Sequence, residues 1–134
     1  MQLWAVLFCQ PITDRLRANY IGYWLRYRVW LAALLLTAVL DYLSTVHFMR
    51  EDGIHFELHP LVRYSALLAG PAIGVGLAKL FQLAATFLVT LYCKVLARYI
   101  FFSTTVFYGW AAWYNVWGCD LYRPWALQFM PSWW

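Results

Sequence analysis

Three long apolar stretches follow one another along the chain, and polar or charged residues bound each of them. They cover about residues 29–49, 71–93 and 99–117. A helix of about 20 residues is long enough to cross a hydrocarbon core of roughly 30 Å. The pattern therefore predicts an all-α membrane protein with three transmembrane helices over these ranges.

A different pattern precedes the first stretch. Between residues 12 and 28, arginines alternate with apolar and aromatic residues that recur at steps of three and four. This spacing is typical of an amphipathic helix in the headgroup plane of an anionic leaflet, although a helix packed on a soluble partner has the same pattern. We expect residues 1–28 to form a cytoplasmic interfacial segment. Its expected lipid or partner contacts are Arg15, Arg17, Trp24, Arg26 and Arg28.

Residues 50–63 form a polar connection between the first two apolar stretches. Gly53 marks a turn in it, and Pro60 marks a helix start because proline is tolerated at the first helical position. Two interpretations of residues 61–70 stay open, a short helix or a first turn of the second span.

The predicted three-helix bundle covers residues 29–117, and an aromatic tail follows it at 118–134. Amphipathic rings settle at the headgroup level of a membrane, so the tail is expected to be an interfacial anchor. The tryptophans expected to contact lipid or partner proteins are Trp110, Trp113, Trp117, Trp125, Trp133 and Trp134.

The composition favours the bilayer as the solvent of this chain. Of its 134 residues, 64% are hydrophobic and 12% are charged, whereas soluble domains have about 25% charged residues. One domain of this length is too small to bury so much apolar surface. Six of the ten basic residues lie before residue 29 or at 94–98. The positive-inside rule therefore predicts a multi-pass protein of a bacterial inner membrane with a cytoplasmic N-terminus and a periplasmic C-terminus.

Each predicted span carries polar residues on one helical face, at steps of three, four or seven residues. Three such faces are expected to turn inward together, where the polar groups can bond to one another instead of to lipid. We call these residues the polar seam: Thr37, Asp41, Thr45, Lys79, Gln82, Thr86, Tyr108 and Asn115.

Asp41 and Lys79 are the charged members of the polar seam. A carboxylate at the centre of a span costs about 2.5–3.5 kcal/mol on insertion scales, so it needs a partner or a purpose. Both residues lie eight positions from the outer end of their spans, which places them roughly 12 Å below the same boundary. We expect an ion pair, and we favour a role in fixing helix packing over a proton, ion or substrate site.

A second group of candidate residues lies in the polar connection. In an extended segment, His55, Glu57 and His59 would project to the same side and could hold a divalent metal such as zinc or copper. His47 and Asp52 are near enough in sequence to contribute. In the competing interpretation Glu57 pairs with Arg63 and His59 caps the helix that follows.

Several of these polar residues occur in a recognisable order, Asp41-x-x-x-Thr45, Glu57-x-His59-Pro60, Lys79 and Asn115. This order resembles a family of small bacterial and archaeal membrane proteins of unknown function, whose hallmark is an Asp-x-x-x-Thr span followed by Glu-x-Asn-Pro. The resemblance covers roughly residues 30–117 and implies three spans but no activity. The chain departs from it at His59, where the family has asparagine, a better helix cap.

Three function classes follow from these observations. The first is a non-catalytic accessory or assembly subunit of a photosynthetic, respiratory or oxidase-type membrane complex, which packs through aromatic helix surfaces. The second is a small transporter or proton relay that uses Asp41 and Lys79, and the third is a metal-binding membrane protein. Protease, hydrolase and phosphate-binding motifs are missing from the sequence, so an enzyme is not favoured. We expect no cofactor of its own, although a partner's pigment or quinone could contact the aromatic surface; nucleic acid is not an expected partner.

Overall fold

The computed structural model describes residues 12–118, and every regular element in that range is helical. In chain order the elements are α2 (Ile12–Tyr20), α3 (Tyr23–Glu51), η1 (Ile54–Phe56), α4 (Pro60–Ala69), α5 (Pro71–Tyr92), α6 (Ala97–Trp113) and η2 (Tyr114–Gly118). The predicted all-α class is confirmed. Residues 1–11 of the expected interfacial segment, and 119–134 of the expected tail with Trp125, Trp133 and Trp134, lie outside the described residues.

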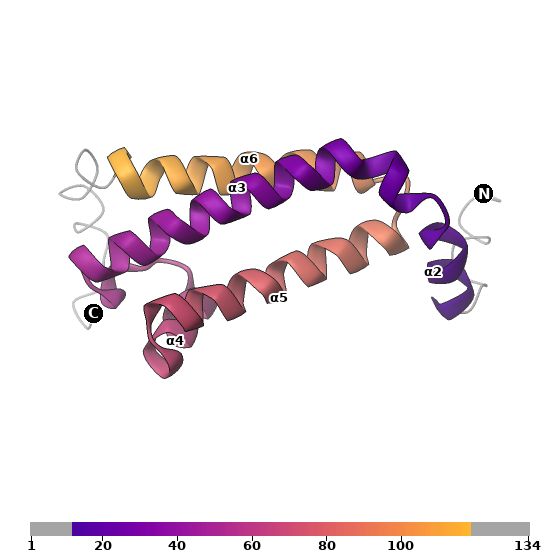
Figure 1. Ribbon diagram of the computed structural model, residues 1–134. Coiled ribbons are helices and arrows are strands. Elements are labelled where there is room, and N and C mark those ends of the chain that lie inside the picture. Colours follow the sequence, from indigo (N-terminus) through magenta and orange to yellow (C-terminus); the bar gives the residue numbers. More distant parts are fainter. Residues whose placement is uncertain (1–11, 119–134) are drawn as a thin grey trace, which may run out of the picture.

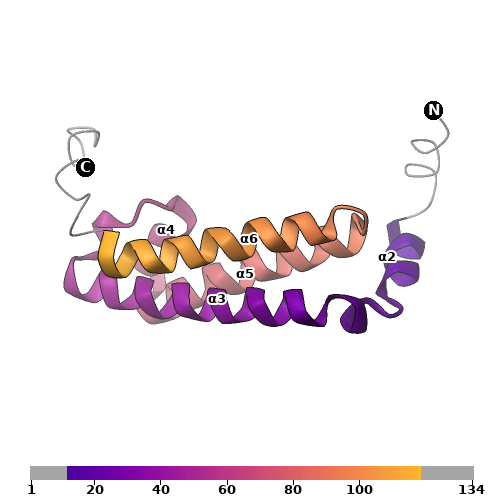
Figure 2. The same cartoon turned by 90° about the horizontal axis from the view of Figure 1, so that it is seen from above.

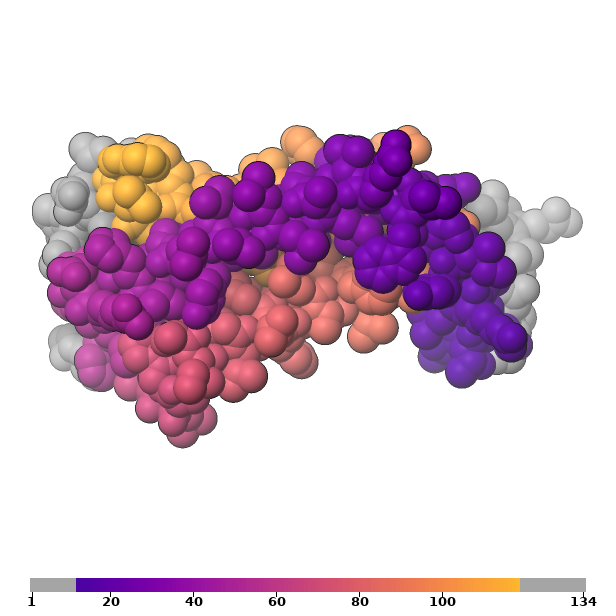
Figure 3. Space-filling view, in the orientation of Figure 1, coloured from indigo at the N-terminus to yellow at the C-terminus, as the bar shows by residue number. Residues whose placement is uncertain are grey.

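The body of the molecule is a bundle of α3, α5 and α6 (Figure 1). α3 and α6 run in the same direction and pack against each other along their lengths, while α5 runs in the opposite direction and packs against this pair from one side. α2 lies across one end of this bundle, and α4 lies near the other end (Figure 2). In the space-filling view, α4 and the start of α5 project from the bundle at the end opposite α2 (Figure 3).

Two of these helices are long and apolar enough to cross a membrane, α3 and α5. In their most apolar windows only 28% and 17% of the residues are buried. The core helix of a soluble protein would be mostly buried, so these helices instead present apolar side chains to their surroundings, as lipid-facing helices do. The helix at the third predicted span, α6, has 17 residues, fewer than the roughly 20 that a span needs.

The helix boundaries agree with the pattern most closely in the second half of the chain. The second span was predicted at 71–93, and α5 ends at Tyr92 with Cys93 as its C-cap. The open question at residues 61–70 is resolved as a separate helix, because α4 ends at Ala69 and the φ of +81° at its C-cap, Gly70, separates it from α5. Such a positive φ favours glycine, which has no Cβ to clash with the backbone.

The N-terminal amphipathic helix is shorter than predicted. It ends at Tyr20, and α3 begins at Tyr23, six residues before the predicted start of the first span. Gly22 lies between them with a φ of +70°, so the chain turns there and the second half of the expected interfacial helix becomes the first turns of α3. Tyr23 and Tyr27 are therefore buried in the bundle core, not placed on an interfacial face.

Two separate groups of buried apolar side chains form the core, one in each half of the bundle. The group near α2 includes Tyr23, Tyr27, Leu34, Ala38, Leu91, Ala97, Phe101 and Tyr108. The group near α4 includes Val46, Phe48, Met49, Val62, Ala66, Val75 and Ala78. The polar residues of α3 at positions 41–45 lie between the two groups along the helix, so apolar packing flanks the charged part of the seam on α3.

Tyr23 provides a test of the packing near α2. Its buried hydroxyl bonds to Thr90 on α5, so Tyr23→Phe removes one hydrogen bond while it keeps the ring. We expect a loss of about 1 kcal/mol in the free energy of unfolding, the usual net value of such a bond. Unfolding in mixed micelles measures it, and Tyr20→Phe, at an exposed position, is the matched control. Equal stability of wild type and Tyr23→Phe would contradict this packing.

Candidate functional site

The ion pair expected from the sequence is present at the centre of the bundle. Lys79 of α5 donates to the carboxylate of Asp41 on α3. Asp41 is 2% exposed, and its other oxygen accepts a hydrogen bond of 3.2 Å from the hydroxyl of Thr45, one turn along α3. Both carboxylate oxygens of Asp41 are thus bonded inside the protein, which offsets the cost of burying the charge.

Asn115 joins this pair from the third helix. It lies in η2, the π-helical turn that continues α6, and its side-chain amide donates to Thr45 at 2.9 Å and to Ser44 at 3.2 Å. Asn115, Ser44 and Thr45 thus hold α3 and α6 at one register in the half of the bundle near α4. π-helical turns often occur at functional sites, and here the turn places the amide against α3.

Tyr108 and Gln82 extend the network toward the middle of α5. The ammonium of Lys79 lies 4.7 Å from the centre of the Tyr108 ring, a distance at which a cation is attracted to the ring face. The Tyr108 hydroxyl donates to the side-chain oxygen of Gln82 at 3.2 Å. Lys79 therefore has partners on both neighbouring helices, a carboxylate on α3 and an aromatic ring on α6.

His59 and Glu57 reach the same network, which the sequence pattern did not indicate. The ring of His59, the residue before α4, lies 3.4 Å from the Gln82 amide. Glu57 accepts a hydrogen bond of 2.9 Å from the His59 backbone N–H. We call the connected set the central polar cluster; its members are Asp41, Ser44, Thr45, Glu57, His59, Lys79, Gln82, Tyr108 and Asn115.

The position of α4 explains how His59 arrives there. α4 crosses the first turns of α5 at very close range, because Gly74 of α5 has no side chain and lies directly against the backbone of Ser65 and Ala66. This crossing holds the start of α4 against the bundle. Gly70 and Gly74, four residues apart, were the available signals of a close approach, but they do not specify which residue of the connection would meet Gln82.

The surroundings of Glu57 shift the pKa of its carboxyl. Burial raises its pKa above the ordinary value of 4.5, and the negative charge of Asp41 adds to the rise. The His59 N–H bond and the positive charge of Lys79 act in the opposite direction. The net rise means that the folded protein holds the Glu57 proton more tightly than an unfolded chain does.

This rise predicts a pH dependence of stability. Between 4.5 and the raised pKa, the folded state keeps the Glu57 proton and the unfolded state has lost it, so the free energy of unfolding falls as pH increases. Glu57→Gln is expected to remove the contribution of Glu57 to this decrease in the free energy of unfolding. Unfolding in mixed micelles at a series of pH values checks it, with Glu51→Gln as the exposed control. A pH profile that Glu57→Gln leaves unchanged would contradict the burial of this carboxyl.

Two members of the predicted polar seam, Thr37 and Thr86, bond to carbonyls of their own helices. Thr37 donates to the carbonyls of Ala33 and Leu34 in its own helix, both at 3.1 Å. Thr86 donates to the carbonyl of Gln82 at 2.9 Å. A threonine hydroxyl in a helix commonly bonds the preceding turn in this way, so the shared face that the spacing predicted does not bring these two hydroxyls into the central polar cluster.

The structure does not form the predicted metal site. Within residues 12–118, His, Cys, Asp and Glu side chains nowhere gather in a group of three that could hold a metal ion. His55 lies in the short helix η1, whereas Glu57 and His59 have extended backbone, so the three residues do not form one extended segment with a shared side. Glu57 is bonded to the His59 backbone, and the His59 ring faces Gln82. His59 also occupies the N-cap position of α4, where its side chain makes no capping bond.

The basic residues near α2 occupy different settings. Arg15 lies over the ring of Tyr92 at 4.4 Å, and Asn19 donates to the Leu91 carbonyl at 2.9 Å, so α2 is attached to the end of α5. Arg17 is exposed on the same helix. The other residues expected to contact lipid or partners here, Arg26, Arg28 and Trp24, are exposed on the first turns of α3.

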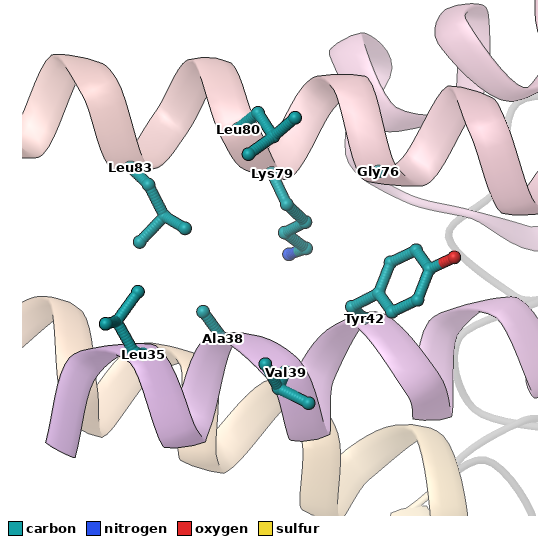
Figure 4. Close-up of a pocket in the computed structure, with 8 residues that line it drawn as sticks. All are labelled: Leu35, Ala38, Val39, Tyr42, Gly76, Lys79, Leu80 and Leu83. Atoms are coloured by element: carbon teal, nitrogen blue, oxygen red, sulfur yellow. The ribbon is translucent and has the colours of Figure 1, made fainter. Parts of the chain in front are cut away.

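An apolar groove of about 230 Å³ lies between α3 and α5 beside the ion pair. The side chain of Lys79 extends from α5 toward α3 in this region (Figure 4). Around it are Leu35, Ala38, Val39, Tyr42, Gly76, Leu80 and Leu83. These lining residues suit lipid chains, so the groove adds no polar ligand-binding group to the central polar cluster.

The aromatic residues expected on the third helix are exposed. Residues at steps of three and four, the spacing of one helical face, share this exposure from the start of α6 into η2. We call them the exposed face of α6: Tyr99, Phe102, Val106, Trp110, Trp113 and Trp117.

No family model, curated protein or solved structure matches the chain, so its resemblance to the small bacterial and archaeal membrane-protein family stays a prediction.

Proposed function

We propose that the chain is a three-span protein of a bacterial inner membrane that serves as a non-catalytic accessory subunit of a larger membrane complex. α3 and α5 provide two spans, and α6 continued by η2 provides the third. The 17 residues of α6 and the 5 of η2 are together as long as a membrane-crossing helix of about 20 residues. The N-terminus is cytoplasmic in this arrangement, because four arginines precede or begin α3 and Lys94 and Arg98 lie at the same end.

The observation that carries this proposal is that members of the central polar cluster satisfy one another's charges and hydrogen bonds. Asp41 is bonded to Lys79 and Thr45, Asn115 is bonded to two hydroxyls, and Gln82 is bonded to Tyr108. A buried polar network whose members satisfy one another rigidifies a core and specifies one packing. The charges of Asp41 and Lys79 therefore stabilise the packing of the bundle, which suits a structural subunit better than a transporter.

The exposed face of α6 provides the proposed contact with a partner subunit. Aromatic residues are enriched at the centres of protein interfaces because they cover a large area with few rotatable bonds. One helical face with three tryptophans, Trp110, Trp113 and Trp117, all exposed, can pack on a partner helix or on a flat pigment or quinone that the partner holds.

Mild detergent extraction from the source membrane tests this proposal. The wild-type protein is expected to migrate in native electrophoresis as part of a complex much larger than its own mass. Trp110→Ala with Trp113→Ala is expected to shift at least nine-tenths of it to the free form, whereas Phe81→Ala with Leu77→Ala, at exposed positions of α5, serves as the matched control. A wild-type protein that runs alone, or equal shifts in both pairs, would count against the accessory role.

A proton relay is the second candidate, and the contact of His59 with Gln82, with Glu57 bonded to His59, is the observation that favours it. Proton flux into liposomes that contain the purified protein separates the two functions. Asp41→Asn combined with Lys79→Met removes both charges together, so neither is left unpaired. A relay loses its flux in this double variant, while an accessory subunit shows no flux above empty liposomes in either form.

A further inference from the structure

The central polar cluster meets the protein surface beside the middle of α5, where His59 reaches Gln82. His59 is exposed, and its ring lies 3.4 Å from the Gln82 amide. Glu57 is half-buried beside it. Residues 57–59 have no regular structure, and irregular backbone beside a membrane bundle is stable only where it is buried in protein or meets water. Contacts thus lead from this surface to Gln82 and from Gln82 to the Tyr108 hydroxyl, and the Tyr108 ring in turn lies against the ammonium of Lys79.

The end of the bundle near α2 is closed by aromatic packing. Tyr23 lies 5.1 Å from Tyr27 and 5.3 Å from Phe87, ring centre to ring centre, and Phe101 lies 5.6 Å from Tyr27. Thr90 is fully buried among these residues, and its hydroxyl donates to carbonyls of its own helix while it bonds Tyr23. Between Gln82 and the α2 end, the hydroxyls of Thr86 and Thr90 bond to carbonyls of α5 itself, and buried rings fill the space around Thr90.

We propose that Glu57 and His59 form an entrance through which water and protons from the outer face reach the central polar cluster, and that the aromatic packing closes the cluster to the cytoplasm. The inference rests on the membrane placement given under the proposed function, but not on the accessory role. The ligands that this entrance admits are small, namely water and hydronium. A molecule that needs an open pocket is excluded. In this conformation the cluster exchanges protons with the outside only.

Cysteine labelling in sealed membranes tests the entrance. In a chain whose native cysteines are replaced by alanine, Gln82→Cys is expected to react with a charged, membrane-impermeant thiol reagent added outside and to react at least tenfold more slowly when the reagent is inside. Asn115→Cys is a second reporter of the same cluster if Gln82→Cys does not fold. Leu80→Cys, exposed on α5 two residues away, is expected to be shielded by lipid from either side.

A blocking substitution sharpens the test. His59→Trp places a large ring at the proposed entrance and is expected to slow outside labelling of Gln82→Cys at least tenfold, while His55→Trp, at the exposed position of η1, leaves the rate within twofold. Equal labelling from both sides, no labelling at either reporter, or a rate that His59→Trp leaves unchanged would overturn the entrance. Rapid labelling of Leu80→Cys would instead overturn the membrane placement, so the two failures are distinguishable.

Discussion

Asp41→Asn alone is expected to destabilise the protein by about 3–5 kcal/mol, the cost typical of removing one member of a buried ion pair. The reason is that the ammonium of Lys79 would lose its partner, the carboxylate of Asp41, although it would keep its contact with the Tyr108 ring. Lys79→Met alone is expected to cost a similar amount, because Asp41 is 2% exposed and would be left as an unpaired buried charge. Unfolding in mixed micelles measures both losses.

The double variant Asp41→Asn with Lys79→Met distinguishes a pair from two separate contributions. We expect it to recover most of the stability, since replacing a buried ion pair by groups of similar volume is often nearly neutral. Glu51→Gln, an exposed carboxylate at the end of the same helix, controls for the change of charge and should cost less than about 0.5 kcal/mol. Additive losses in the double variant would show that the two residues do not interact.

Gly74→Ala is expected to be the second severe change, with a loss of about 3 kcal/mol or more, the upper end of the range for overpacking. A Cβ at this position would overlap backbone atoms of Ser65 and Ala66. Backbone cannot rotate away as a flexible side chain can, so α4 would have to separate from α5. Because α4 positions His59, the variant is also expected to weaken the contact between His59 and Gln82.

Gly76→Ala is the matched control, two residues along the same helix. A Cβ there would lie 3.6 Å from the Tyr42 ring, which is ordinary van der Waals contact. Alanine is also the better helix former, so this change is expected to be neutral or to stabilise α5 by up to about 1 kcal/mol. The same unfolding measurement applies to both variants. If Gly74→Ala is as stable as Gly76→Ala, the close crossing of α4 and α5 is wrong.

Asp41 and Lys79 could be paired from the sequence because helix geometry is sufficient for that inference. A charge near the centre of an apolar stretch needs a partner, and the constant rise of a helix converts sequence position into depth. The contacts of Asn115 with Ser44 and Thr45 extend the same logic to the third helix. Helix existence and approximate depth are properties of each stretch taken by itself.

Glu57 and His59 could not be placed in this way. Their position depends on where α4 crosses α5, and that crossing is determined by backbone contact at Gly74, not by a repeat of polar residues. The sequence pattern allowed a metal site at these residues and His55, because alternate residues of an extended strand share a side. His55 lies in a helical turn instead, and the geometry on which the metal interpretation rested is absent.

Tyr23 and Tyr27 show a second limit of the pattern. Aromatic residues at helical spacing have the same sequence signature on an interfacial helix and in a bundle core. Gly22 was the available signal, since a glycine within an otherwise amphipathic run often marks a turn. With a φ of +70° it ends the interfacial helix early, and the tyrosines then bond to Thr90 and to the Lys94 carbonyl on and after α5.

The contact between Lys79 and Asp41 in a lipid bilayer is the most direct test of the account. Solid-state NMR on protein labelled with ¹⁵N in lysine side chains and with ¹³C in aspartate carboxylates measures it, because the chain has only two lysines, Lys79 and Lys94. We predict strong dipolar coupling between one ammonium and one carboxylate, and its loss in Lys79→Met. A wild-type spectrum without that coupling would contradict the central ion pair and the function proposed from it.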